Sequence, residues 1–229
     1  MSSEIADYLK NIPIFAELPA DDLEKIARLF RERKYKKNDV IFLEEDTGQY
    51  LYLVREGRVK VTRLLPNGKE MILAFHEAGE YFGEMALIDG GTTPATVTAV
   101  LPTTLYIMGA REFQTLIQHP KASSVLLKTL CQRCREAWVQ IEVLTFHNAD
   151  ARIRMAFHQL VHTRGVKTQK GYVIPMKLTH KELSDIVGIS RETATRVLSH
   201  LQEEGLIKVE TRRFVIPDPE RLMDDVLFA

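Results

Sequence analysis

The spacing of apolar residues changes from helical to strand-like near residue 33. Residues 1–20 are predicted to form a short helix and a loop, and residues 21–30 have the apolar spacing of a helix. Short apolar runs separated by turn residues follow as far as residue 108, and such runs are typical of strands. Their near-regular spacing indicates a barrel or a sandwich. The strands are predicted over residues 40–43, 50–54, 58–62, 71–75, 95–100 and 104–108, with hairpin turns at 56–57 and 66–68.

A short helix over residues 111–118 ends at a proline, and a long helix is predicted over residues 121–146. Its apolar seam has the alternating spacing of three and four that defines a heptad repeat. Packing against the preceding β domain is the alternative, and Val125, Leu126 and Trp138 are candidates for it. Because the alternation lasts almost three heptads, we expect the same helix of a second copy as the partner. The predicted homodimer interface is Leu127, Leu130, Cys134, Ala137, Ile141 and Leu144.

Two short helices joined by a glycine turn form the most informative local pattern. Thr179 and Glu182 have the spacing of a capping box at the start of the first helix. Gly188 ends that helix, where the backbone must leave the helical path. Ser190 is predicted to cap the second helix and Gly205 to end it. This arrangement is typical of a helix-turn-helix motif.

The second helix of this motif separates apolar and charged residues onto different faces. Its buried face is predicted to hold Ala194, Val197, Leu198 and Leu201. Arg191, Glu192 and Arg196 lie on another face in the first two turns, where a recognition helix presents side chains to base edges. An ordinary hairpin with a solvated face could also carry these charges. The agreement of caps, turn and charge placement favours DNA recognition.

Further elements surround the motif. Residues 151–163 are predicted to form a helix, and residues 165–171 a polar loop. After the motif, residues 206–210 and 214–216 are predicted to form a small hairpin, which we interpret as a wing. Arginines at its turn, residues 211–213, could contact phosphate, although solvated arginines at a hairpin tip need no such role.

Composition limits the possible classes of protein. A chain of 229 residues is expected to form two domains, and its two cysteines are too few for a disulfide framework. The net charge is zero, but residues 150–217 hold 12 Lys and Arg against 7 Asp and Glu. This local basic excess fits contact with double-stranded DNA. Because no apolar run is long enough to span a membrane and no signal-peptide pattern is present, we expect a soluble cytoplasmic protein without membrane partners.

Enzyme motifs are missing from the sequence. It contains no Gly-x-Ser-x-Gly, phosphate-binding loop or His-Glu-x-x-His pattern, so no catalytic residue is predicted and the protein is not expected to be an enzyme. The competing class is a cyclic-nucleotide-binding or other ligand-binding regulatory module without sequence-specific DNA readout. The helix-turn-helix and wing argue against that class.

Three segments resemble one family. They are the opening at residues 11–15, the Phe-Gly-Glu-Met-Ala-Leu run at 82–87, and the Gly-Ile-Ser-Arg-Glu-Thr run at 188–193 followed by Arg196. The chain resembles the cyclic AMP receptor protein and fumarate–nitrate reduction regulator family of bacterial transcription factors over nearly its whole length. The resemblance implies an α+β fold with a β-roll effector domain, a dimerisation helix and a C-terminal winged helix-turn-helix. The corresponding ranges here are residues 1–118, 119–148 and 149–229.

The same resemblance implies roles in reading DNA. Arg191 and Arg196 match the family's guanine readers, and Glu192 matches the residue that accepts from cytosine. Half-sites close to TGTGA, arranged as a palindrome, are therefore expected, with RNA polymerase as a further partner. Thr179, Ser190 and Thr193 are the remaining predicted DNA-binding residues.

The effector site departs from the family pattern. In cyclic-nucleotide-binding members an arginine and a small hydroxyl residue hold the phosphate, whereas Pro94 and Ala95 occupy these positions here. A phosphate without a cationic partner is poorly compensated, so binding of cyclic AMP is not expected. Glu84 is retained, and we expect it to serve the fold by accepting backbone N–H bonds. The predicted pocket positions are Gly83, Glu84, Thr92, Thr93, Ala95, Ala137 and Trp138, the last two standing where those members bind the purine.

The sequence does not identify an effector that takes the place of cyclic AMP. The β-roll could bind another small molecule, hold a cofactor, or bind nothing. Cys131 and Cys134 are too few ligands for an iron–sulfur cluster or structural zinc, and no metal site is predicted among the seven histidines. His76 could ligate a haem, as in gas-sensing relatives, but a lone histidine at a strand end is usually polar surface. The two cysteines are either redox-active or inert packing residues.

Overall fold

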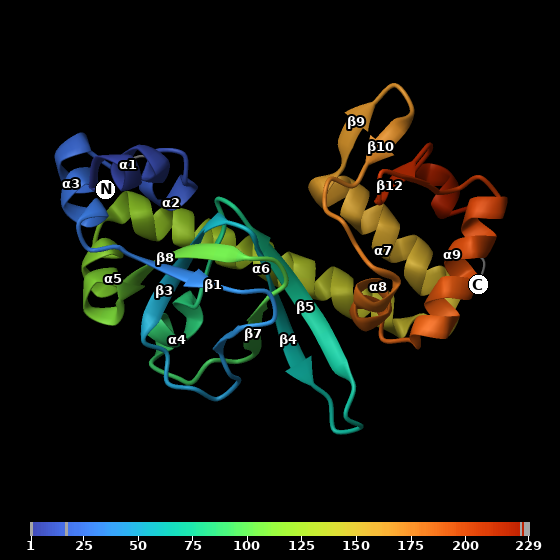
Figure 1. Ribbon diagram of the computed structural model, residues 1–229, viewed down its shortest axis with the longest axis horizontal. Helices are drawn as coiled ribbons and strands as arrows, with labels where there is room; N and C mark the ends of the chain where they lie inside the picture. Colours follow the sequence, from blue (N-terminus) through green and yellow to red (C-terminus); the bar gives the residue numbers. More distant parts are fainter. Residues whose placement is uncertain (1, 17, 225, 227–229) are drawn as a thin grey trace. The chain divides into compact units, whose positions relative to one another are not determined.

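The computed structural model describes residues 2–16, 18–224 and 226 and divides into two compact units (Figure 1). The first is Met1–Arg133 and the second is Cys134–Ala229. The boundary lies within one continuous helix, α6, which spans Pro120–Thr145. The predicted α+β class with a β-roll, a long helix and a winged helix-turn-helix is confirmed. No helix in the described residues is both long and apolar enough to cross a bilayer.

The first unit combines an antiparallel β-roll with short helices (Figure 1). Its two four-stranded sheets have the orders β1-β8-β3-β6 and β2-β7-β4-β5. The strands are β1 (Arg31–Tyr35), β2 (Val40–Phe42), β3 (Tyr50–Glu56), β4 (Arg58–Leu64), β5 (Glu70–Glu77), β6 (Tyr81–Phe82), β7 (Thr96–Ala99) and β8 (Thr103–Gly109). The helices are α1 (Ser2–Leu9), α2 (Pro13–Ala16), α3 (Ala20–Ala27), α4 (Glu84–Asp89), α5 (Ala110–Leu116) and the start of α6.

Strand β3 is apolar from Tyr50 to Val54 because both of its faces are covered there. Leu51 and Leu53 point into a core that includes residues of the N-terminal helices, α5 and the first turns of α6. Tyr52 and Val54 point the other way, into the interior of the roll. Alternate side chains of a strand project to opposite faces, so a strand buried on both sides cannot show polar alternation. Strand β8 is divided between the same two cores.

Some elements of the first unit differ from the sequence predictions. Strand β1 was not predicted, because four of its five residues are exposed and it pairs with β8 through backbone hydrogen bonds. The short β6 and α4 were also not predicted. The helix expected over residues 21–30 ends at Ala27, and Phe30 reaches the core from outside the helix.

The second unit is a winged helix-turn-helix. It contains the end of α6, α7 (Ala149–Arg164), α8 (His180–Val187), α9 (Arg191–Glu203) and the 3-10 helix η1 (Glu220–Leu222). Its four-stranded sheet has the order β11-β12-β10-β9, with β9 (Val166–Thr168), β10 (Gly171–Val173), β11 (Lys208–Glu210) and β12 (Arg213–Ile216).

The polar loop predicted over residues 165–171 is wrong, because most of this segment forms strand β9 and the start of β10. Its side chains are exposed or half-buried, so no apolar alternation marks it. The segment is ordered by strand pairing, with Tyr172 opposite Ile216 in β12. The predicted wing hairpin is confirmed as β11 and β12.

Candidate DNA-binding surface and effector pocket

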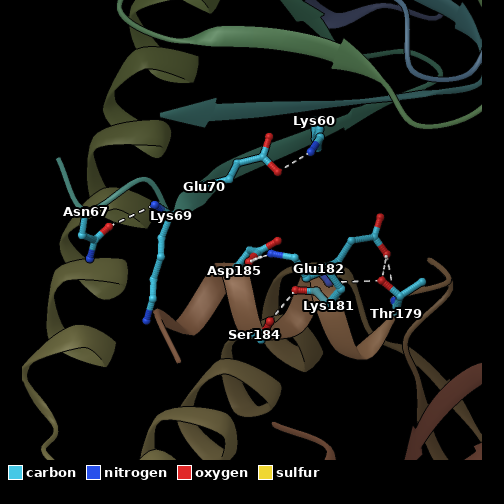
Figure 2. A network of polar contacts seen from close by, with 9 residues as sticks. All are labelled: Lys60, Asn67, Lys69, Glu70, Thr179, Lys181, Glu182, Ser184 and Asp185. Carbon is cyan, nitrogen blue, oxygen red and sulfur yellow. Dashed lines mark hydrogen bonds and ion pairs between the residues drawn. The ribbon is translucent and has the colours of Figure 1, made fainter. Parts of the chain in front are cut away.

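Helix α8 begins with the predicted capping box (Figure 2). The Thr179 hydroxyl accepts the Glu182 N–H at 3.1 Å, and the Glu182 carboxylate accepts the Thr179 N–H at 2.8 Å. Both bonds satisfy backbone donors that a helix start leaves without partners. Gly188 ends the helix with a φ of 71°, a left-handed conformation that favours glycine.

Helix α9 presents the predicted charged face to solvent. Arg191, Glu192 and Arg196 are exposed, whereas Ala194 and Leu198 on the other side are fully buried. Ser190 caps the helix, and its hydroxyl accepts the Thr193 N–H at 3.1 Å. The Thr193 hydroxyl lies 3.0 Å from that of Ser190. Of the six predicted DNA-binding residues, three therefore have exposed charged ends, and the Thr179, Ser190 and Thr193 hydroxyls serve the caps.

Contacts at the start of α9 favour the ionised form of Glu192, which accepts hydrogen bonds. The pKa of Glu192 is lowered, first by its own backbone N–H, then by the Ser190 hydroxyl and by the charge of Arg191. An ionised carboxylate is an acceptor only, so it suits the cytosine amino group and offers no donor to guanine O6.

Sequence reasoning missed two residues beside this face. The Thr195 hydroxyl is exposed and lies 3.0 Å from His180 Nδ1, which joins the start of α8 to α9. Thr195 lies four positions after Arg191, so the two share a helix face. That spacing could have identified Thr195, but nothing in the sequence indicated the contact with His180.

A buried arginine fixes the far end of α9 and was also missed. Arg154 on α7 is 3% exposed and pairs with Asp150 on its own helix. Its Nη2 lies 2.9 Å from Glu204, the residue that ends α9. Arg154 is buried whereas Glu204 is exposed, so the pair links the end of α9 to α7 through a desolvated guanidinium.

The end of α6 is tied to the first helix of the motif. Gln140 Nε2, on α6, donates to the Ile186 carbonyl at 2.6 Å, and Arg152 Nη1, on the adjoining α7, donates to the Val187 carbonyl at 3.2 Å. Both acceptors lie in the last turn of α8, where carbonyls lack helical partners. Movement of this end of α6 would therefore act directly on α8.

The exposed apolar stripe of α6 lacks three of the six residues of the predicted interface, which are Leu130, Ala137 and Leu144. Leu130 packs against the core of the first unit, and Leu144 lies beside Gly188. Val125 and Leu126 also pack on the first unit's core, as the alternative prediction expected, but Trp138 is 63% exposed. Ala137 is exposed next to it. The exposed stripe consists of Leu127, Cys131, Cys134, Trp138 and Ile141, with spacings of four and three.

Glu84, the polar group retained in the predicted effector pocket, is bonded within the chain. It is 1% exposed, and its Oε1 accepts a bond from Arg133 Nη1. Arg133 also donates to the Tyr81 carbonyl, so it joins α6 to strand β6 and to the start of α4. Glu84 was expected to accept backbone N–H bonds, and the observed partner is this guanidinium instead. Gly83 has a φ of 87°, and a Cβ there would lie 2.7 Å from the Tyr50 carbonyl oxygen.

The other pocket residues serve the roll itself. Thr93 is buried, and its hydroxyl donates to the Leu43 carbonyl at 2.5 Å. Thr92 is exposed and bridges to Thr47, and Ala95 is buried. Gly83 and Thr93 line a cavity of about 10 Å³, which is room for one water molecule. The aromatic rings of Phe42, Tyr52 and Phe82 pack together beside it.

His76 is packed in the interior of the roll, whereas it was expected to be polar surface. It is 9% exposed, and its ring stacks on Phe82 at 5.6 Å with 9° between the planes. Its Nδ1 lies 3.6 Å from Glu80. One ring face is thus covered by an aromatic side chain, as in a packed core histidine, and we derive no role for haem from it.

Comparison with known proteins identifies the family. Residues 32–119 match the model of the cyclic nucleotide-binding domain, and residues 151–224 match that of the Crp-like helix-turn-helix domain. Over 202 residues the chain is 34% identical to the cyclic AMP receptor protein of Thermus thermophilus, covering 88% of this chain and 90% of the relative. The chain belongs to the Crp/Fnr family of transcription regulators. Members of this family regulate transcription through DNA binding and are not enzymes.

Relatives within this Crp/Fnr family carry different regulatory names. The chain is 27% identical over 192 residues to the global nitrogen regulator of Synechococcus elongatus, covering 82% of this chain and 86% of the relative. Among solved structures, a CooA mutant from Carboxydothermus hydrogenoformans has a TM-score of 0.75 at 25% identity, covering 87% of this chain and 88% of that one. The catabolite activator protein of Thermus thermophilus has a TM-score of 0.53 at 32% identity, covering 94% and 99%. Family membership therefore leaves the effector open.

Proposed function

We propose that this regulator acts as a homodimer, reads palindromic half-sites close to TGTGA, and is not controlled by cyclic AMP. Its domains would be the effector domain 1–118, the dimerisation helix 119–148 and the DNA-binding domain 149–229. RNA polymerase would be its partner at promoters in the cytoplasm.

The exposed start of α9 carries the proposal for DNA readout. Arg191 and Arg196 can each donate two bonds to guanine O6 and N7, and Glu192 can accept from cytosine N4. All three lie within two turns after the Ser190 cap, where a recognition helix meets base edges.

Binding to a palindromic duplex and to single-base variants of it tests this readout. Arg196→Ala is expected to weaken binding by about 1–3 kcal/mol at its own base pair and to reduce discrimination there. Lys208→Ala, an exposed cation on the wing, serves as the control, because loss of a phosphate contact weakens all sequences about equally. Unchanged ratios between guanine-containing and substituted sites for Arg196→Ala would contradict the proposal. Titrations at two salt concentrations separate the contribution of phosphate contacts to DNA affinity from that of base contacts, because the phosphate contribution falls with salt.

Dimerisation is supported by the apolar stripe of α6. Leu127, Trp138 and Ile141 are each more than 60% exposed, and alternate spacings of four and three suit a parallel coiled coil. A second copy would bury this stripe around a two-fold axis, which matches a palindromic DNA site. We therefore place the seam at Leu127, Cys131, Cys134, Trp138 and Ile141.

Independence from cyclic AMP is supported by the contacts of the pocket residues. Pro94 supplies neither cation nor N–H donor, Glu84 is paired with Arg133, and the cavity beside Gly83 holds about 10 Å³. A ligand that binds only the folded state raises its stability by mass action. Micromolar cyclic AMP is expected to change neither the melting temperature nor the DNA affinity. A clear rise in melting temperature would contradict this part of the proposal and leave the DNA readout intact.

A further inference from the structure

The second unit brings two histidines and a glutamate together on the side of α7. His158 and His162 lie one turn apart, and their Nε2 atoms are 3.1 Å apart. Glu220 lies more than fifty residues later, in η1, and its carboxylate joins them, so that ligand atoms of all three residues lie within 4.8 Å of one another. No metal site was predicted, because the histidines were taken to lack ligand spacing. His158 and His162 are nevertheless four residues apart in the sequence, and only the return of η1 to α7 could not be predicted from it.

The arrangement has the chemistry of a transition-metal site. Zinc bonds to histidine nitrogen and carboxylate oxygen are about 2.0–2.2 Å long, so two ligand atoms of a tetrahedral ion lie about 3.4 Å apart. The two Nε2 atoms are close to that separation. Two imidazoles and one carboxylate suit zinc and its neighbours in the first transition row rather than magnesium or calcium.

The surroundings leave a fourth coordination position open. His162 and Glu220 line a groove of about 410 Å³, together with Lys167, Tyr172 and Asp218. Leu222 is fully buried, so the segment that carries Glu220 is anchored next to the groove. His158 is half-buried, whereas His162 and Glu220 are exposed and accessible to an ion from solution.

We propose that His158, His162 and Glu220 form a binding site for a divalent transition metal of the zinc class, with a water molecule in the fourth position. The ion would link η1 to α7 and so hold the C-terminal segment on the helix that supports the wing sheet and α9. The site is separate from the DNA-contacting residues and does not depend on their assignment.

Zinc competition with a chromophoric chelator tests the site on the full chain, freed of metal beforehand. One ion per chain is expected at this site, with a zinc-dependent rise in melting temperature. Glu220→Gln is expected to lower zinc affinity by at least about tenfold, because loss of even outer-shell partners costs about that much. His162→Ala should abolish the site. Glu203→Gln removes the same charge from an exposed position on α9, outside the groove, and is expected to leave the affinity unchanged.

Two results would overturn the proposal. Equal zinc affinity in Glu220→Gln and the unmodified chain would show that the histidine pair alone binds the ion. Retention of binding in His162→Ala, with loss in a Cys131→Ser/Cys134→Ser chain, would assign the ion to the exposed cysteines. Far-UV circular dichroism of each variant checks folding, and the exposure of His162 and Glu220 predicts that it is unchanged.

Discussion

Tyr52 shows how individual side chains occupy the interior of the β-roll. Its ring stacks on Phe82 at 5.0 Å and is tilted against Phe42 at 5.4 Å. Burial is the main cause that raises the pKa of Tyr52 to about 12, and the nearby Tyr35 adds to it. The neutral phenol is therefore part of the packed core, and its ionisation would place a charge among aromatic rings.

Alkaline titration is expected to reveal this residue. The folded pKa of Tyr52 lies above the unfolded value of 10.0, so its contribution to stability is complete below pH 10 and is lost as the pH rises toward about 12. Tyrosinate absorbance and far-UV circular dichroism recorded together should show ionisation of Tyr52 coinciding with unfolding of the roll. Tyr52→Phe, which cannot ionise, should unfold at higher pH, whereas Tyr172→Phe in the other unit should not shift the unfolding of the roll. Ionisation of Tyr52 near its usual pKa in a folded chain would contradict this expectation.

Among the elements, helix α9 depends most on how it begins. The Ser190 hydroxyl is the side-chain acceptor for the Thr193 N–H, and the same hydroxyl helps to lower the pKa of Glu192. The Ser190 cap thus orders the first turn and adds to the lowering of the Glu192 pKa, for which the backbone N–H of Glu192 is the larger cause. The far end is fixed separately by Arg154 and Glu204.

Removal of this cap is expected to weaken the DNA-binding unit. Ser190→Ala should cost about 1 kcal/mol, measured from the unfolding transition of that unit. Ser199→Ala is the matched control, because Ser199 lies in the same helix and bonds only back to the Thr195 carbonyl. The control should stay within about 0.5 kcal/mol of the unmodified chain. Equal destabilisation by the two substitutions would show that the Ser190 cap has no special role.

Across the whole molecule, the sequence predicted elements whose periodicity is determined locally. Residues 178–198 specified caps, turn and faces through neighbours a few positions apart, and the structure confirms them. Strand β9 pairs with the neighbouring β10, and it was missed because its exposed residues show no apolar alternation. Strand β1 was missed because its partner β8 lies far along the chain. The ligand group of His158, His162 and Glu220 depends on the same kind of distant contact. No local pattern encodes such pairings.

The interface of the proposed dimer also depends on contacts that the local sequence pattern does not encode. The heptad spacing of α6 is compatible with either of two seams, which share Leu127, Cys134 and Ile141. Only the packing of Leu130 and Leu144 on the chain's own units distinguishes them. The remaining exposed stripe contains Cys131 as well as Cys134, whereas the seam predicted from sequence contained Cys134 alone.

Oxidative cross-linking distinguishes the two seams. In a parallel dimer, a seam residue faces its counterpart across the two-fold axis, within the distance that a disulfide can span. We expect mild oxidation to give a covalent dimer in Cys131→Ser and in Cys134→Ser alike, and none in the double variant, on non-reducing electrophoresis. A bridge that disappears in Cys134→Ser but survives in Cys131→Ser would restore the seam predicted from sequence. A chain that sediments as a monomer at micromolar concentration would contradict both seams.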